Sequence, residues 1–230
     1  MLTGDLKGDN LASTAFNMTT PTIRQTVLEV ERKFSHLRIY PFKADGGSPP
    51  FHTLAYHGTE TFCDKYFDHH NRLSAAGTWV RRRNGHWESK IRQAGDYTNS
   101  QFQEIQDLAE ISRHVYSITK ISGQSCNDFG LSKMAEFVTY REKWIADERF
   151  EVVLDNTDFG HTVGEIELKE LKNVRPGIEA QACCKLLDQE IEAFMRRYSW
   201  AFSSAPPIGK LTAYFSRLRR QDCELLFRYY

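Results

Sequence analysis

Alternation of polar and apolar residues dominates the middle of this chain. Side chains two positions apart on an extended strand point to the same face, so this alternation is typical of β-strands with two unlike faces. The pattern predicts strands over residues 27–34, 61–67, 78–83, 87–92, 135–144, 150–155 and 162–171. Asn84-Gly85, between two of these segments, is a strong signal for a two-residue hairpin turn.

Helical periodicity is confined to fewer segments. It predicts helices over residues 105–120 and 178–198, and a last segment, 211–227, that begins as a strand and ends as a helix. The apolar stripe of the second helix is formed by Ile178, Ala182, Leu186, Leu187, Ile191 and Phe194. Many hairpin-linked strands with few helices predict an α+β fold, in which one antiparallel sheet curls or closes.

The polar face of these strands carries charges of both signs. Glu29, Glu31 and Lys33 alternate in the first strand, where two acids and a base share one face. The same pattern returns along the chain in Arg81 with Arg83, Glu88 with Lys90 and Arg92, Arg141 with Lys143, and Glu165 with Glu167 and Lys169. A charged row therefore recurs on one face of the predicted sheet.

Two arrangements account for these rows. Either the charges face water and the apolar partners face a core, or the sheet closes, with charges in its lumen and helices on its outer apolar face. Patterning alone leaves both open. Like charges side by side, as in Arg81 with Arg83, favour the second, because a counter-ion or ligand can then separate them. The amphipathic helices also need an apolar sheet face on which to pack.

Size and charge narrow the class of protein. The 230 residues, 40% of them hydrophobic, suffice for one well-buried domain. Thirty basic residues balance thirty acidic ones, so we expect neither nucleic acid nor a membrane as a partner. No run of 18 apolar residues occurs that would predict a membrane span. We expect a monomer.

Two segments are predicted to lack regular structure. Residues 1–22 are rich in Thr, Ser, Asn and Gly, which predicts a flexible tail ahead of a single domain over residues 23–230. Residues 43–50 contain two Gly and two Pro and are predicted to form a loop. The five cysteines include no Cys-x-x-Cys pair, so we expect reduced thiols and a cytoplasmic location.

A closed sheet would bring the charged rows together and suggests a chemistry. Arginine gives bidentate contacts to phosphate, so the spaced bases suit a polyanion such as a triphosphate. Clustered carboxylates suit a hard divalent cation, Mg²⁺ or Mn²⁺. The chain has no Gly-rich phosphate loop of the Walker type. The pattern therefore indicates a site for a metal–polyphosphate complex outside the P-loop class.

The ordered motifs resemble those of a known family. Glu-Val-Glu-Arg-Lys (29–33) resembles the ExExK signature of the CYTH, or triphosphate tunnel metalloenzyme, superfamily. There follow, in the expected order, Asp-Lys-Tyr-Phe-Asp (64–68), Trp-Val-Arg-Arg-Arg (79–83), Trp-Glu-Ser-Lys (87–90), Phe-Val-Thr-Tyr-Arg (137–141), Gly-Glu-Ile-Glu (164–167) and Gly-Lys-Leu (209–211). Over residues 27–227 the chain is most similar to the branch of animal thiamine triphosphatases. The resemblance implies a closed eight-stranded antiparallel β-barrel, the tunnel, with helices packed outside.

The same resemblance implies roles for individual residues. The bases that would hold the triphosphate are Arg81, Arg83, Lys90, Arg141 and Lys210, and the acids that would bind metal, directly or through waters, are Glu29, Glu31, Asp155, Glu165 and Glu167. Lys33 and Tyr66 take the positions of a pair that activates the attacking water. A phenol is a poor base at its reference pKa of about 10, so a neighbouring ammonium is needed to favour the phenolate.

Three functions fit such a tunnel. The branch implies Mg²⁺-dependent hydrolysis of thiamine triphosphate, a small-molecule partner. The alternatives are an inorganic triphosphatase and a non-catalytic polyphosphate- or nucleotide-binding protein, while a class IV adenylyl cyclase fits the C-terminal motif less well. Selectivity for thiamine needs an aromatic platform, for which Trp79, Trp87, Phe42 and Phe51 are candidates, although packing is the commoner role of such residues.

Overall fold

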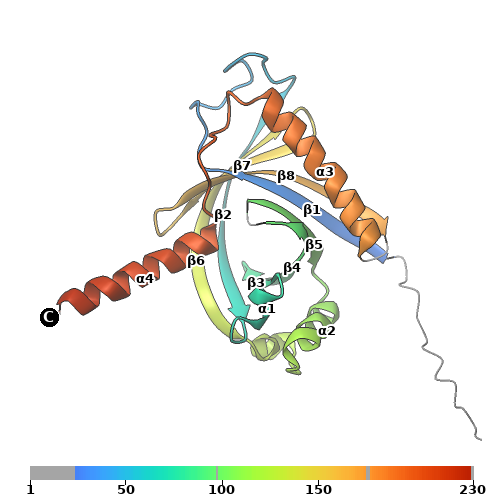
Figure 1. Cartoon of the computed structure of the whole chain (residues 1–230), viewed down its shortest axis with the longest axis vertical. Helices are drawn as coiled ribbons and strands as arrows, with labels where there is room; N and C mark the ends of the chain where they lie inside the picture. Colours follow the sequence, from blue (N-terminus) through green and yellow to red (C-terminus); the bar gives the residue numbers. More distant parts are fainter. Residues whose placement is uncertain (1–23, 97, 175–176, 229–230) are drawn as a thin grey trace, which may run out of the picture.

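Eight antiparallel strands close into one barrel, as Figure 1 shows. The computed structural model describes residues 24–96, 98–174 and 177–228, with the side chains of residue 24 and of residues 220–228 excepted. The strands are β1 (Arg24–Phe34), β2 (Leu54–Asp68), β3 (Thr78–Arg83), β4 (His86–Gly95), β5 (Asn99–Ile105), β6 (Ser132–Ala146), β7 (Phe150–Thr157) and β8 (Thr162–Val174). They follow one another around the ring as β1-β5-β4-β3-β2-β6-β7-β8, and β8 pairs with β1 to close it. The predicted α+β fold with a closed eight-stranded barrel is confirmed.

The lumen carries the charged rows, as the second of the two predicted arrangements requires. On β1, Leu28 and Val30 are completely buried in an apolar cluster outside the barrel. Glu29 and Glu31, which alternate with them, point the opposite way and line the internal cavity. The same alternation holds on β8. The arrangement with water-facing charges is therefore wrong, because helices cover the outer apolar face.

The outer cover over β1 and β8 is helix α3 (Ile178–Arg197). Figure 1 shows this helix lying across the two strands. Its buried face consists of Ala180, Cys184, Leu187, Ile191 and Phe194. Leu187, Ile191 and Phe194 agree with the predicted stripe, whereas Ile178, Ala182 and Leu186 are exposed. The prediction placed the N-terminal half of the stripe on the wrong side, because small Ala180 and Cys184 form the contact there.

Strand β5 is absent from the predicted strands. Its sequence, Asn-Ser-Gln-Phe-Gln-Glu-Ile, contains mostly polar side chains, so its period-two pattern is weak. It pairs with β4 and β1, and the register along β4 shifts between Arg92 and Ala94, which marks a β-bulge. The helix predicted over 105–120 is found as α2 (Leu108–Thr119), and Asp107 caps its N-terminus.

Short helical segments fill two of the connections. Helix α1 (Arg72–Ala75) follows β2, and the 3₁₀ segment η1 (Ser125–Gly130) precedes β6. Neither was predicted. At the β3–β4 turn, Asn84 and Gly85 have φ angles of 46° and 90°, as the predicted hairpin requires. The loop predicted over 43–50 contains neither helix nor strand.

The last segment is a helix from its start, α4 (Lys210–Arg228), so the prediction of an initial strand is wrong. Leu211, Tyr214 and Phe215 pack against Tyr66 and its neighbours at the barrel wall. Figure 1 shows the rest of α4 pointing away from the barrel. The first turn of α4 therefore belongs to the tunnel.

Several expectations concern the chain as a whole. The tail predicted over residues 1–22 lies outside the described residues. No helix in the described part of the chain is long and apolar enough to span a membrane. Cys63, Cys126, Cys183 and Cys184 are free thiols, as predicted.

Candidate active site in the barrel lumen

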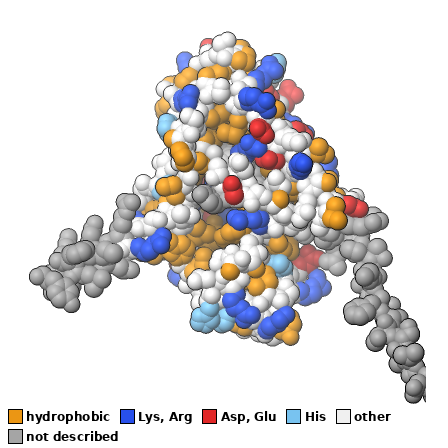
Figure 2. Space-filling model, in the orientation of Figure 1, with side chains coloured by type: hydrophobic (Ala, Val, Ile, Leu, Met, Phe, Trp, Pro, Cys, Tyr) orange, Lys and Arg blue, Asp and Glu red, His pale blue; other side chains and the backbone are white. Residues whose placement is uncertain are grey.

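One cavity inside the barrel collects most of the predicted site residues. Its lining includes the predicted bases Lys33, Arg81, Arg83, Lys90, Arg141 and Lys210 and four acids, Glu29, Glu31, Glu165 and Glu167. Two further bases, Arg92 and Lys169, complete it, so eight basic side chains face four acidic ones. Figure 2 shows acidic and basic side chains mixed around the centre of the molecule. Asp155 lies behind this lining rather than in it.

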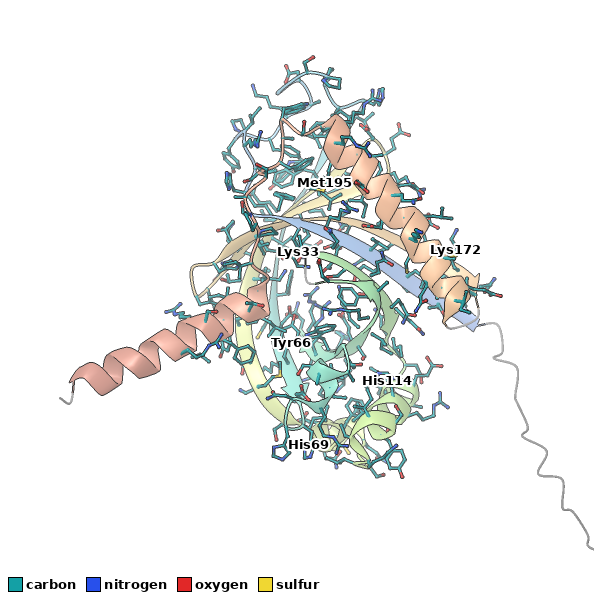
Figure 3. The ribbon with its side chains drawn as sticks, in the orientation of Figure 1. Lys33, Tyr66, His69, His114, Lys172 and Met195 are labelled. Carbon is teal, nitrogen blue, oxygen red and sulfur yellow. The ribbon has the colours of Figure 1, made fainter. Side chains whose placement is uncertain are left out.

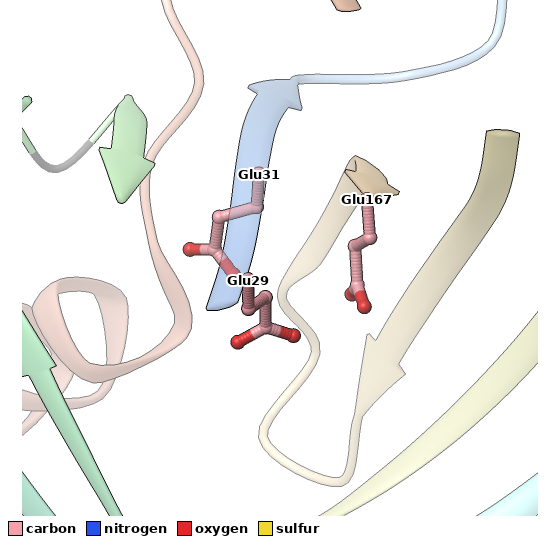
Figure 4. Close-up of side chains that lie close together, drawn as sticks. All are labelled: Glu29, Glu31 and Glu167. Atoms are coloured by element: carbon pink, nitrogen blue, oxygen red, sulfur yellow. The ribbon is translucent and has the colours of Figure 1, made fainter. Parts of the chain in front are cut away.

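Three of the acids converge on one point. Glu31 stands directly opposite Glu167 in the β1–β8 ladder, and Glu29 stands opposite Lys169. One carboxylate oxygen from each of Glu29, Glu31 and Glu167 lies within 4.8 Å of the others. Figure 4 shows the two side chains from β1 and the one from β8 reaching toward a shared space. Directly opposed like charges destabilise a sheet, so this cluster needs positive charge close by.

Burial increases the cost of placing these three carboxylates close together. Glu29, Glu31 and Glu167 are 0%, 5% and 2% exposed. Both oxygens of Glu29 and Oε2 of Glu167 lack a hydrogen-bond partner of good geometry among the described residues. They do form ion pairs: Lys169 Nζ lies 2.8 Å from Glu29 Oε1 and 3.4 Å from Glu167 Oε2, and Lys90 contacts the other oxygen of Glu29. Attraction without aligned hydrogen bonds leaves lone pairs free for a metal.

The pKa shifts divide the cluster into two kinds of group. Burial opposes ionisation of Glu29, yet Lys90 and Lys169 hold its pKa well below the usual range. Burial raises the pKa of Glu167 to about 7, even though Lys169 and Arg141 act in the opposite direction. Near neutral pH Glu167 is therefore partly protonated, and a divalent cation can displace that proton. The donor set, carboxylate oxygens alone, fits Mg²⁺ or Mn²⁺.

The other two predicted metal ligands are engaged with bases. Asp155 accepts a bidentate pair from Arg141, Nε to Oδ1 at 2.7 Å and Nη2 to Oδ2 at 2.8 Å. It also contacts the ammonium of Lys210. Glu165 lies 3.3 Å from Arg141, 3.6 Å from Lys33 and 3.7 Å from Lys210. Their metal-binding role stays a prediction.

The paired arginines of β3 have their own carboxylates. Arg83 donates from Nε and Nη2 to the two oxygens of Asp64 at 2.8 and 2.7 Å, and Arg81 donates from Nε to Glu88 at 2.8 Å. Burial opposes ionisation of Asp64, but Arg83 and Arg81 keep its pKa below the usual value. Asp64 and Glu88 were given no role from sequence. Asp64 lies two residues before Tyr66 on the same strand face, a spacing that could have identified it.

Lys90 lies between the two acids of β1 and one acid of β5. Its Nζ contacts Glu29 and lies 3.6 Å from both Glu31 and Glu104. Glu104 belongs to β5, so it was missed together with that strand. Lys169 was recognised in the charged row but was given no task.

Lys33 and Tyr66 both line the cavity but keep different neighbours. Lys33 contacts Glu31 and lies 3.6 Å from Glu165, and the ring of Tyr66 stacks on Phe137 at 5.7 Å. Burial opposes the charge of Arg81, but Tyr66 is the first of the neighbours that raise its pKa well above the usual value. Figure 3 shows Lys33 and Tyr66 on different sides of the ring. Their pairing stays a prediction.

Aromatic residues in the cavity are few. Trp79 lines it, together with Phe102 of β5, 5.6 Å away between ring centroids. The other three proposed platforms, Trp87, Phe42 and Phe51, are buried in apolar clusters outside this cavity, which is the packing role.

Comparison with known proteins now places the chain in a family. No model of a protein family matches it. It is 32% identical over 226 residues to the human protein named thiamine-triphosphatase, covering 88% of this chain and 90% of that protein. The chain belongs to the thiamine triphosphatase family. The family resemblance of its motifs is thereby confirmed.

One solved structure shows the same fold, and another matches more weakly. The PH1819 protein from Pyrococcus horikoshii OT3 has a TM-score of 0.52 at 17% identity and covers 82% of this chain and 99% of that one. HpAC1 from Hippeastrum, described as having a dominant triphosphatase activity, has a TM-score of 0.43 at 18% identity, over 82% of this chain and 95% of that one. Membership of the thiamine triphosphatase family thus rests on the sequence, and the barrel on the structure.

Proposed function

We propose that this chain is a triphosphatase that needs a divalent cation, with thiamine triphosphate as its first candidate substrate. The observation that carries the proposal is one cavity in which eight basic side chains face four acidic ones and three of the acids converge. Such a lining matches a polyanion bound with a hard cation. The name of the human relative supports hydrolysis and suggests thiamine triphosphate.

Glu29, Glu31 and Glu167 would hold Mg²⁺ or Mn²⁺, and Glu165 and Asp155 would reach the ion through bridging waters. A bound ion would neutralise charge on the oxygens of the transferred phosphoryl group. Arg81, Arg83, Lys90, Arg141 and Lys210 would bind the phosphates, exchanging their present carboxylate partners for phosphate oxygens.

Lys33 and Tyr66 are proposed to activate the attacking water. Burial opposes the charge of Lys33, but Glu31 and Glu165 raise its pKa, so it stays an ammonium and cannot accept a proton itself. Its ammonium would bind and orient the water, and Tyr66 would take the proton from it.

Phosphate release tests the proposal directly. The purified chain is given thiamine triphosphate, tripolyphosphate and ATP side by side, with Mg²⁺, with Mn²⁺ and with EDTA. Release that depends on the metal supports a triphosphatase, and the highest kcat/KM identifies the substrate. Tight binding of all three without release would instead identify a non-catalytic binding protein.

Tripolyphosphate is the second candidate substrate, and the isolated guanidinium of Arg92 is the observation that favours it. A small-molecule triphosphate as partner, a monomeric state and a cytoplasmic location complete the proposal.

A further inference from the structure

Arg92 differs from every other base in the cavity lining. Each of the other seven forms an ion pair with a carboxylate (Asp64, Glu88, Asp155 or an acid of the lining), whereas Arg92 forms no ion pair or hydrogen bond with another described side chain. Its Nε is buried and has no hydrogen-bond partner. A buried donor without a partner is costly, so it is most readily explained by a ligand that supplies an acceptor.

The fold holds Arg92 in place. Its backbone N–H donates to Gly77 O at 2.8 Å. A Cβ at Gly77 would lie only 3.2 Å from the Cβ of Arg92, and Gly77 has a φ of 71°, so glycine is needed there. The bulge between Arg92 and Ala94 re-aims the strand at this point.

The guanidinium lies on the aromatic part of the cavity. Its Cζ is 4.8 Å from the ring centroid of Trp79, and Arg92 stands opposite Phe102 in the β4–β5 ladder. Trp79 offers an aromatic face to which a cationic ring, such as the thiazolium of thiamine, would be attracted. A cationic ring at that platform would meet the fixed positive charge of Arg92, whereas an anionic group would be attracted to it.

We propose that Arg92 is a specificity-determining residue, which favours triphosphates whose inner end is a free anionic phosphate over triphosphates whose inner end is esterified to a cationic aromatic group. Inorganic tripolyphosphate represents the first class and thiamine triphosphate the second. This inference rests on the proposed function and sharpens its substrate class.

The test measures kcat/KM for tripolyphosphate and thiamine triphosphate in wild type, Arg92→Gln and Arg92→Lys. In Arg92→Gln the ratio of tripolyphosphate to thiamine triphosphate falls about tenfold, mainly through KM, because a charged hydrogen bond is lost to only one substrate. Arg92→Lys keeps the charge and recovers most of the ratio. A ratio that stays within about twofold of wild type, or rises, overturns the proposal.

The matched control is Arg113→Gln on α2, which removes the same charge from a side chain that is 69% exposed. Its ratio stays that of wild type, and thermal unfolding confirms that each variant is folded. If the wild-type chain releases no phosphate, the proposed function is contradicted. The role of Arg92 can then still be tested by measuring the binding of tripolyphosphate by calorimetry. Weaker binding in Arg92→Gln than in Arg113→Gln supports the inference, and equal binding overturns it.

Discussion

The buried charges on the two sides of the lumen are paired in different ways. On β1 and β8 the acids are neighbours in the same ladder, where Glu31 faces Glu167. On β3 and β6, Arg83 and Arg141 each form a hydrogen-bonded fork with one carboxylate, Asp64 and Asp155, and Arg141 also lies 3.3 Å from Glu165 and 3.4 Å from Glu167. On the acidic side, the three converging acids share Lys33, Lys90 and Lys169 as their cations. On the basic side, Arg81 and Arg83 each have a carboxylate of their own. Substrate and metal should therefore affect the two sides very differently.

The largest expected effect comes from the acidic side. Glu31→Gln removes one of the three converging carboxylates, and we expect metal-dependent phosphate release to fall by at least about 10³-fold, since electrostatic stabilisation is usually the largest catalytic term. Release is measured with Mg²⁺ and Mn²⁺. The control is Glu170→Gln, on the outward face of β8 beside Arg149, which should keep wild-type activity. Activity in Glu31→Gln near that of the control would remove the acid cluster from the mechanism.

On the basic side, we expect a substitution to lower the free energy of unfolding. Arg141 is 7% exposed, and Arg141→Leu leaves Asp155 with Lys210 as its remaining described ion-pair partner. We expect a loss of about 3 kcal/mol in the free energy of unfolding, because a broken buried pair leaves a charge poorly compensated. Adding Asp155→Leu should recover much of it. Urea unfolding measures both, and a double variant no more stable than the single one would show that the Arg141–Asp155 pair does not dominate the ion pairs on this side.

A third expected effect is a pH dependence on the acidic side. The pKa of Glu167 is raised from 4.5 to about 7 by burial. The folded state thus binds this proton more tightly than the unfolded state, so the stabilising contribution is complete below pH 4.5 and is lost as pH rises through 7. Without metal, the stability of wild type relative to Glu167→Gln should decline across that window.

Urea unfolding at several pH values measures this decline. Saturating Mn²⁺ should remove most of it, because the ion replaces the proton at the carboxylates. A stability difference that is independent of pH in the metal-free protein would show that the acidic side is already well compensated.

Prediction from sequence succeeded where a local pattern carried the information. The alternation of Glu29 with Val30 and of Glu165 with Ile166 is a property of consecutive residues, and so the charged lumen could be anticipated. It failed for β5, whose side chains show little contrast between polar and apolar positions. Glu104 and Phe102, which lie on β5, were therefore missed. The start of α4 was misjudged because the tunnel wall, rather than local propensity, holds Leu211 and Tyr214.

Pairing across the barrel was beyond the reach of sequence. Strand register fixes that Arg141 meets Asp155 on β7, but nothing near either residue in the sequence states it. The isolation of Arg92 is equally invisible, because its charged row on β4 looks the same as the others. Recognising the family assigned roles by position, whereas only the structure shows which bases already have a carboxylate partner.

The carboxylate partners of the arginines affect how strongly free phosphate can bind in the tunnel. Orthophosphate carries too little charge to displace several carboxylates at once, and the side chain of Asp64 or Asp155 is tethered beside its arginine at a high effective concentration. A triphosphate engages several forks together and gains from each. The carboxylate partners would thereby weaken inhibition of the proposed triphosphatase by the phosphate that it releases.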